Sequence, residues 1–221
     1  MAITIESPDF VTYDFETLSD VSWNCTVLSF GVVSGKWADL ATDDGINELI
    51  KNGKEYFFKI SNQEDYGRYS VQRTIDFWKT QPEEARNRFK NQPKHDLAEF
   101  VNIFDDYCRD VNINRKTTIW CRGLDFDPVI VNSIYHQFGR ELLPYHHTRL
   151  RDIRTAIESK QEDTYIPNFV EFVSEKYGLI SHGALHDSIR DTLQLYYAYT
   201  KTEDEIKELY DDVGVKYEPK Y

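Results

Sequence analysis

Apolar and polar residues alternate at the start of the chain in a way that predicts β-strands. Residues 10–16 alternate with a period of two, which places successive side chains on opposite faces of a strand. Two further runs rich in β-branched and aromatic residues follow at 27–33 and 56–60. Because the stretches between these runs are polar or contain glycine, the three strands are expected to form an antiparallel meander. A fourth, short and buried strand is expected at 117–121.

The rest of the chain has mostly the spacing of helices. Residues 96–108 carry apolar side chains close to the helical period. Further helices are expected at 74–79, 82–86, 127–138, 152–158, 168–177 and 188–200, before an acidic and weakly helical tail at 203–221. This order of elements predicts an α/β fold in which a mixed sheet is flanked by helices, within a single domain over residues 1–221. A ribonuclease-H-like sheet is one layout that fits.

The charge balance restricts the function. The chain has 26 basic and 38 acidic residues, a net charge of −12. A protein that coats or bends duplex DNA holds many phosphates and is usually basic, so that class is excluded. A nuclease is not excluded, because carboxylates that bind divalent cations are negative until the metal arrives.

Cysteine usage and hydropathy indicate the compartment. Cys25, Cys108 and Cys121 are odd in number and lack CxxC spacing, which argues against a disulfide framework or a zinc knuckle. No apolar run approaches the roughly 20 residues that span a bilayer, and the N-terminus lacks the pattern of a signal peptide. We therefore expect a cytoplasmic protein without a membrane partner, in the host cytoplasm if a phage encodes it.

Asp14 and Glu16 form the first candidate site. They alternate with Tyr13 and Phe15, so both carboxylates point to the same face of the first strand. Two carboxylates on one face repel each other and lose solvation, which favours a bound cation or a basic partner. A solvated strand face is the alternative, and the pair alone does not decide between them.

The second candidate acid is Asp127, which follows the strand at 117–121. It precedes Pro128 at a helix start, where an N-cap is the simplest role for an aspartate. Asp125, two residues earlier, is expected to be a solvated loop acid.

The third candidate segment is 186–191. A helix is expected to begin near Asp187 or Ser188, which would leave His186 just before it on mobile backbone. Asp191 would lie one turn inside the helix and face the first strand. A mobile histidine beside an anchored carboxylate suits a general base, whereas a capping pair with Asp187 as the cap is the structural alternative. The remaining histidines considered are expected to be structural or exposed: His95, His136, His146, His147 and His182.

Together these acids fit the hydrolysis of phosphodiesters. Two divalent ions roughly 3.5–4 Å apart would stabilise both the attacking and the leaving oxygen. Carboxylate ligands suit hard cations, so Mg²⁺ or Mn²⁺ is the expected cofactor.

The ordered set of motifs resembles a known superfamily. Asp14-x-Glu16, then Phe126-Asp127, then His186-x-x-x-x-Asp191 resemble the three exonuclease motifs of the DEDDh (DnaQ-like) superfamily. The surrounding residues are most similar to bacteriophage exonuclease A and the related bacterial 3′–5′ exoribonuclease-like domains, in segments 13–17, 74–79, 120–123, 151–155 and 186–191. The resemblance implies a ribonuclease-H-like fold and a two-metal 3′–5′ exonuclease that releases nucleoside 5′-monophosphates.

The resemblance also implies a role for each motif residue. Asp14 would bridge both metals, and Glu16 would bind one of them near the terminal 3′-hydroxyl. Asp191 would complete the first metal site, and Asp127 would hold the second metal directly or through water. His186 would take the proton of the attacking water.

Substrate contacts are expected near these motifs. Many relatives outside this branch have Thr-Gly or a similar pair after the first two acids, whereas this chain has Thr17-Leu18, so Leu18 is the candidate for wedging between bases. Trp78 could stack on a base and Arg122 could meet a phosphate, while Trp120 is expected in the core. The expected partner is the 3′ end of a single strand, with DNA favoured over RNA.

Two other functions remain open at this stage. The same residues would serve an exoribonuclease that trims RNA ends, since no reader of the 2′-hydroxyl is identifiable. The fold could also serve a catalytically silent nucleic-acid-binding module, although all five motif residues are present. An acidic mimic of nucleic acid is a further alternative, which predicts acids spread over one surface and indifference to metal.

Overall fold

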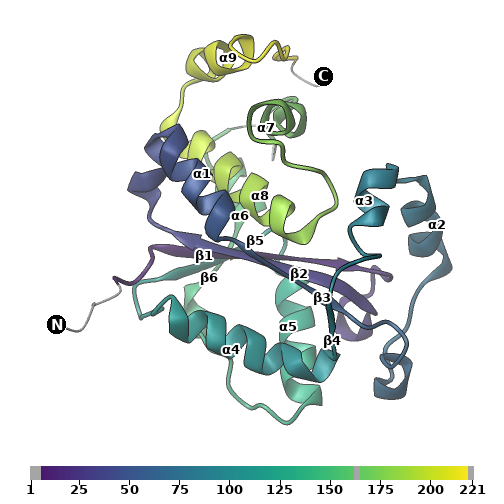
Figure 1. Ribbon diagram of the computed structural model, residues 1–221. Helices are drawn as coiled ribbons and strands as arrows, with labels where there is room; N and C mark the ends of the chain where they lie inside the picture. Colours follow the sequence, from purple (N-terminus) through teal and green to yellow (C-terminus); the bar gives the residue numbers. More distant parts are fainter. Residues whose placement is uncertain (1–5, 162–164, 219–221) are drawn as a thin grey trace.

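A mixed six-stranded sheet forms the centre of the molecule. The computed structural model describes residues 6–161 and 165–218, and its strands lie in the order β4-β3-β2-β1-β5-β6 (Figure 1). The strands are β1 (Phe10–Thr17), β2 (Val27–Gly35), β3 (Lys54–Phe58), β4 (Lys94–His95), β5 (Thr118–Cys121) and β6 (Leu150–Asp152). The expected mixed sheet flanked by helices is confirmed.

The pairing of the strands confirms the antiparallel meander. β1 pairs antiparallel with β2, and β2 pairs antiparallel with β3. β5 then runs parallel to β1 and to β6, and β4 runs parallel to β3. The third strand begins and ends two residues earlier than its aromatic run suggested. β4 and β6 have two and three residues, too short to show a period of two in the sequence.

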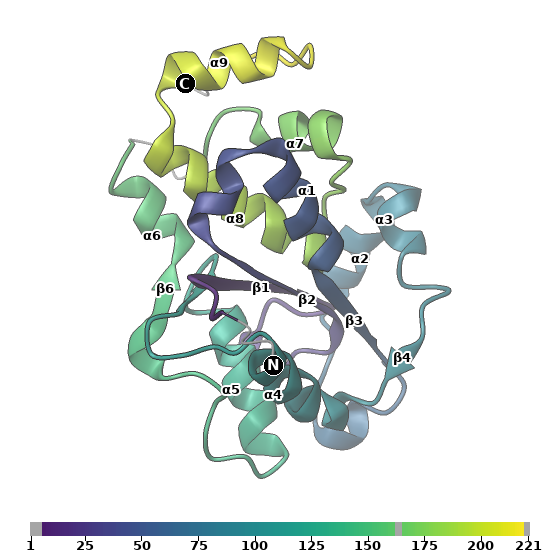
Figure 2. The ribbon, with the colours of Figure 1, turned by 60° about the vertical axis from the view of Figure 1, so that its left-hand side comes forward.

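Helices cover both faces of the sheet (Figures 1 and 2). One face carries α4 (Phe100–Asp110) and α5 (Asp127–Gln137); the opposite face carries α1 (Asp43–Asn52), α6 (Ile153–Glu158), α7 (Phe169–Tyr177) and α8 (Ala184–Thr200). The other helices are α2 (Gln72–Thr80), α3 (Glu83–Asn87) and α9 (Glu203–Asp211), of which α2 and α3 lie near the end of β1. α9 confirms helical structure in the acidic tail, whose residues 219–221 lie outside the described part.

Helix α1 was not expected from the sequence, although it has a start signal. The hydroxyl of Thr42 accepts a hydrogen bond from the amide of Gly45 at 3.2 Å and caps the helix. Asp43 and Asp44 follow in the first turn, where acidic side chains are favourable.

β1 separates two chemically different faces. Tyr13 and Phe15 point into the aromatic core under α4 and α5, which includes Phe30 and Phe100. Because strand side chains alternate, Asp14 and Glu16 point to the face covered by α8. The expected alternation therefore places both acids on one side of the sheet.

The start of α8 differs from the expectation. The helix begins at Ala184 rather than near Asp187 or Ser188, so His186 lies inside its first turn and Asp187 is not its cap. The reason is contact with β2: a Cβ on Gly31 would lie 2.1 Å from the backbone of Ala184. Glycine at this position lets the first turn rest directly on the strand, where the hydroxyl of Ser188 donates to the carbonyl of Gly31 at 3.1 Å.

Within the described residues, no helix has the length and apolarity needed to cross a membrane. The three cysteines are free and buried. The N-terminal segment that lacks a signal-peptide pattern falls in residues 1–5, outside the described part.

Candidate active site

The four motif acids meet in one cavity. The cavity has a volume of about 370 Å³, and among its lining residues are Asp14, Glu16, Asp127 and Asp191. They come from β1, from the start of α5 and from α8, segments that are far apart in the sequence. The structure therefore brings together acids that looked unrelated when each was considered alone.

The acids of β1 are held in an unfavourable setting. Glu16 is 9% exposed, and Asp14 is half-buried beside it. Burial raises the pKa of Asp14 well above its ordinary value, and the nearby carboxylates of Asp127 and Glu16 raise it further. Burial likewise raises the pKa of Glu16, with Asp187 as the main charged contributor. A cation in the cavity would relieve this repulsion.

Asp127 faces the first strand. It is 3% exposed, and its Oδ1 accepts a hydrogen bond from the amide of Phe15 at 3.1 Å. Burial raises the pKa of Asp127 to about 8, although this hydrogen bond acts in the opposite direction. Asp125 is exposed at the rim of the same cavity. Asp127 is thus the acid of this loop that reaches the interior.

Asp191 is fixed by two arginines. It is 2% exposed and faces the cavity as expected, but it lies about two turns inside α8 instead of one, because the helix begins at Ala184. Its Oδ1 lies 3.0 Å from Nε of Arg122 and 3.5 Å from Nε of Arg190. Arg190 also donates from Nη1 to Asp187 at 2.8 Å. These guanidinium groups offset part of the charge of the acids.

Asp187 is an additional acid of the site. It is 8% exposed and lies four residues before Asp191, so both carboxylates share one face of α8. Burial raises the pKa of Asp187 to about 6, against the effect of Arg190. The spacing of these two acids is visible in the sequence, but it carries meaning only if the helix starts before Asp187.

His186 lies outside the cavity. Its Nδ1 accepts a hydrogen bond from the amide of Ile180 at 2.7 Å, and its Nε2 lies 3.2 Å from Nη1 of Arg88. Burial, with a smaller effect of Arg88, lowers the pKa of His186 to about 4. The side chain is therefore neutral and hydrogen-bonded to the loop before α8, instead of resting on mobile backbone before a helix.

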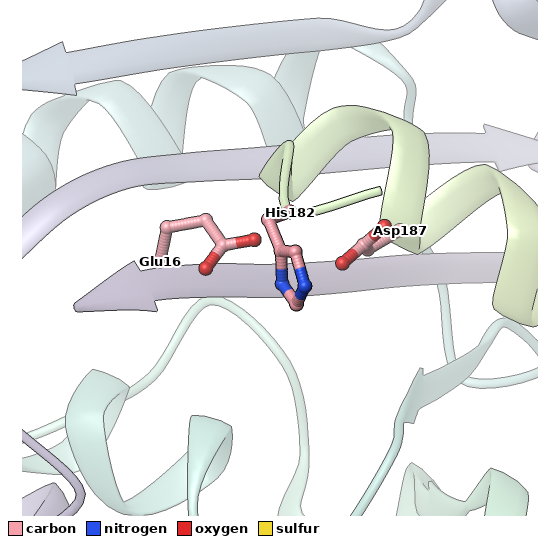
Figure 3. Close-up of side chains that lie close together, drawn as sticks. All are labelled: Glu16, His182 and Asp187. Carbon is pink, nitrogen blue, oxygen red and sulfur yellow. The ribbon is translucent and has the colours of Figure 1, made fainter. Parts of the chain in front are cut away.

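His182 takes the place near the acids that His186 was expected to have. It lies in the loop before α8, has a φ of 60° and lines the cavity. A ring nitrogen of His182, one oxygen of Glu16 and one of Asp187 all lie within 4.8 Å of one another (Figure 3). His182, which was expected to be structural or exposed, is half-buried and lies beside the acids of the cavity. A signal was present, because His182-x-x-x-x-Asp187 repeats the spacing of His186 and Asp191.

Three expected substrate contacts lie at the end of β1. Trp78 is 8% exposed, and its indole N–H donates to the carbonyl of Thr17 at 2.8 Å, so its ring packs α2 against β1 and has little surface for a base. The hydroxyl of Thr17 donates to the carbonyl of Ser19 at 2.6 Å. Leu18 is half-buried. Phe77, the neighbour of Trp78, is 43% exposed.

Arg122 already has partners in this structure. Besides Asp191 it contacts Gln194, and its guanidinium carbon lies 4.5 Å from the centre of the Tyr165 ring. Trp120 packs partly buried against the cores next to α8 and α6.

The donor set of the cavity fits divalent cations. Six acids and three arginines line it, so negative charge is in excess: Asp14, Glu16, Asp125, Asp127, Asp187, Asp191, Arg122, Arg154 and Arg190. Buried carboxylate oxygens that share a cavity are the ligands that Mg²⁺ and Mn²⁺ prefer.

Solved structures with the same fold define the class. Exonuclease I aligns with a TM-score of 0.57 and 13% identity over 94% of this chain and 43% of that chain. E. coli exonuclease I in complex with a dA16 oligonucleotide aligns with a TM-score of 0.55 and 14% identity, over 94% of this chain and 43% of that chain. S. pombe Pop2p in its Mg²⁺- and Mn²⁺-bound form aligns with a TM-score of 0.52 and 10% identity, over 87% of this chain and 84% of that chain. The chain thus has the ribonuclease-H-like fold of the DEDD exonucleases and spans less than half of exonuclease I.

The family is shown by sequence. The model of the 3′-5′ exoribonuclease Rv2179c-like domain matches residues 9–197, and the chain belongs to this family of 3′–5′ exonucleases. The resemblance to DEDD-type exonucleases is confirmed. A comparison with curated proteins finds no match.

Proposed function

We propose that this protein removes nucleotides one at a time from the 3′ end of a single-stranded nucleic acid, releasing nucleoside 5′-monophosphates. The observation that carries the proposal is the meeting of Asp14, Glu16, Asp127 and Asp191 in one cavity with an excess of negative charge. Acids from three distant segments would repel one another there without a cationic ligand.

In this proposal the four acids hold two divalent cations, Mg²⁺ or Mn²⁺. When bound, the cations would stabilise charge on the attacking and leaving oxygens of the phosphodiester. By the resemblance Asp14 would help to hold both ions, whereas Glu16, Asp191 and Asp127 would each help to hold one; Asp14 interacts electrostatically with all three of these acids. Arg122 and Arg190 would give up part of their contact with Asp191 and could then meet the phosphate.

We assign the general base to His186, which must first leave its present position. Its Nδ1 accepts from the amide of Ile180, so the neutral ring carries its proton on Nε2. That N–H faces Nη1 of Arg88, which can only donate, and two donors 3.2 Å apart do not form a hydrogen bond. Rotation toward the cavity would break the hydrogen bond from Ile180 but no favourable contact with Arg88, and the released imidazole could then accept the proton of the attacking water.

The family description favours an RNA strand as the substrate. DNA is the second candidate, because the fold is similar to that of exonuclease I, which has been crystallised with DNA oligonucleotides. The expected preference for DNA over RNA has no support beyond that similarity. We further propose that Leu18 and Thr17, at the end of β1, contact the terminal nucleotide, and that Phe77 offers a base more ring surface than Trp78.

The test is a time course on matched RNA and DNA single strands labelled at the 5′ end. Each strand is incubated with Mg²⁺, with Mn²⁺ and with a chelator, and Asp14→Asn serves as the control protein. A ladder that shortens from the 3′ end only with metal and only with the unaltered protein is expected, and the faster strand identifies the substrate. Binding of both strands in chelator without any cleavage in metal would instead identify a silent binding module.

A further inference from the structure

Trp23 is the most exposed of the four tryptophans. It is 55% exposed, whereas Trp78 is 8% exposed and Trp37 and Trp120 are partly buried. The indole N–H groups of Trp78 and Trp120 each donate a hydrogen bond to an oxygen of the protein. Within residues 6–161 and 165–218 the indole of Trp23 makes no hydrogen bond, so its ring surface is available to a ligand.

Trp23 forms an exposed apolar patch with Val21 and Leu124, which are 43% and 45% exposed. The first two belong to the loop between β1 and β2, and Leu124 belongs to the loop before α5. The hydroxyl of Ser22 donates to the carbonyl of Asp125 at 3.0 Å and joins the two loops, so the three apolar side chains lie on neighbouring segments. Exposed apolar side chains that are grouped in this way commonly mark an interaction site, whereas single ones are ordinary.

The patch adjoins the candidate active site. Asp125, whose carbonyl accepts from Ser22, lies at the rim of the cavity, and Asp127, two residues later, reaches its interior. A single strand whose 3′ end lies among the acids has to leave the cavity over its rim. At the loop of Asp125 the strand would meet the apolar patch directly outside the cavity.

The charge of the protein favours stacking as the way to hold the strand. The chain has a net charge of −12, and six acids against three arginines line the cavity. Affinity that comes from phosphates requires basic side chains, because these displace the counterions of the nucleic acid. Stacking of a base on an aromatic ring does not require a positive surface, and it tolerates every sequence because each base has a flat face. An exposed indole beside the cavity therefore suits an acidic protein that binds a strand.

We propose that Trp23 stacks on a base of the single strand on the 5′ side of the terminal nucleotide, while Val21 and Leu124 border that base. The ligand is an unpaired strand, because only an unstacked base offers its face to an aromatic side chain. The site lies outside the cavity and is separate from the contacts of Thr17 and Leu18 with the terminal nucleotide. Its direction along the strand rests on the proposed function. Trp23 holds the strand and does not touch the reacting phosphate.

The experiment measures the binding of a fluorescently labelled single strand to the full chain in chelator, where no metal supports cleavage. Trp23→Ala is compared with Trp23→Phe, which keeps a ring, and with Tyr199→Ala. The latter is the matched control, because Tyr199 is an aromatic residue that is 50% exposed near the end of α8. We expect the Kd to rise about tenfold in Trp23→Ala, as for the loss of one stacked base, to rise less in Trp23→Phe and to stay unchanged in Tyr199→Ala.

Cleavage of the same strand with Mn²⁺ gives a second readout. Trp23→Ala should raise KM and leave kcat nearly unchanged, because it removes binding that the ground state and the transition state share. A role of Trp23 in supporting the cavity would instead lower kcat.

An unchanged Kd in Trp23→Ala would overturn the proposal, as would an equal loss of affinity in Tyr199→Ala. Failure of the proposed function would look different. If the unaltered protein cleaves no strand in metal while Trp23→Ala still weakens binding in chelator, the proposed function is contradicted and the stacking site stands.

Discussion

The two faces of β1 differ in almost every physical respect. On the face toward α4 and α5, Tyr13 is 1% exposed, its hydroxyl lies 3.1 Å from that of Tyr145, and its ring packs edge-on to Phe104. On the face toward α8, Asp14 and Glu16 are enclosed among other carboxylates that raise their pKa values. Neighbouring residues of one strand therefore face a well-packed aromatic core on one side and a cavity of mutually repelling carboxylates on the other.

The difference separates stability from function. Burial of aromatic rings stabilises the fold without any ligand, whereas buried like charges destabilise it until a cation binds. Buried acids of this kind lower the stability of the fold, and residues that are kept at a cost to stability are typical of a functional site.

The largest effect is expected for Asp191→Asn. We expect turnover to fall about 10⁴-fold, or roughly 5 kcal/mol, because a cation ligand is lost while the shape of the side chain is kept. Single-turnover cleavage of a labelled strand measures the loss, and Asp204→Asn on the exposed surface of α9 is the matched control. Equal rates for both variants would remove Asp191 from the metal site.

Substitutions on the opposite, aromatic face of β1 should lower the stability of the protein without a direct effect on catalysis. Phe100 is fully buried against Phe15, Phe30 and Phe104, so Phe100→Ala should lower the free energy of unfolding by about 3–5 kcal/mol. Denaturant unfolding measures this loss, and Leu142→Ala, whose side chain is 84% exposed, should change it by less than about 0.5 kcal/mol. Similar losses in both variants would contradict the described core.

His186→Ala tests the proposed base. We expect kcat to fall about 10²-fold with little change in KM, because the residue accepts a proton and does not hold the strand. Steady-state rates on the better substrate measure both constants, with the exposed His136→Ala as the control. Normal turnover at neutral pH would exclude His186 as the base.

The smallest effect concerns pH. Burial raises the pKa of Asp127 to about 8 and that of Asp187 to about 6 in the metal-free protein, above the values near 4 of an unfolded chain. Protonation therefore stabilises the fold most below pH 4, and this stability is lost as the pH rises through 6 and 8. Thermal unfolding in chelator from pH 5 to pH 8.5 should show a falling midpoint, and a midpoint that rises over this range would contradict the sign.

Much of the fold follows from the sequence because its strands and longer helices bury one face. The alternation in β1 and the helical period of α4 correctly predicted which face of each element packs in the core. The start of α8 could not be read in the same way, because it depends on Gly31 of a distant strand. Short elements such as β6 are set by pairing with β5 and carry no period of their own.

Part of the candidate site could also be predicted from the sequence, because it lies on a strand and helices with a clear period. The four motif acids were expected, and their meeting in one cavity follows from strand and helix geometry. His182, Asp187 and Arg190 were missed because their positions depend on where α8 begins. His186 was expected at the cavity, whereas a hydrogen bond from the amide of Ile180, in the loop before α8, holds it elsewhere.

The most direct test of the central claim, that the acidic face of β1 is a cation site, is thermal unfolding at pH 8 of the unaltered protein and of Asp14→Asn. Each is measured in chelator and after addition of Mn²⁺. We expect Asp14→Asn to unfold at a higher temperature in chelator and to respond little to Mn²⁺, whereas Mn²⁺ should raise the midpoint of the unaltered protein. A variant that is less stable in chelator and gains as much from Mn²⁺ as the unaltered protein would contradict the claim.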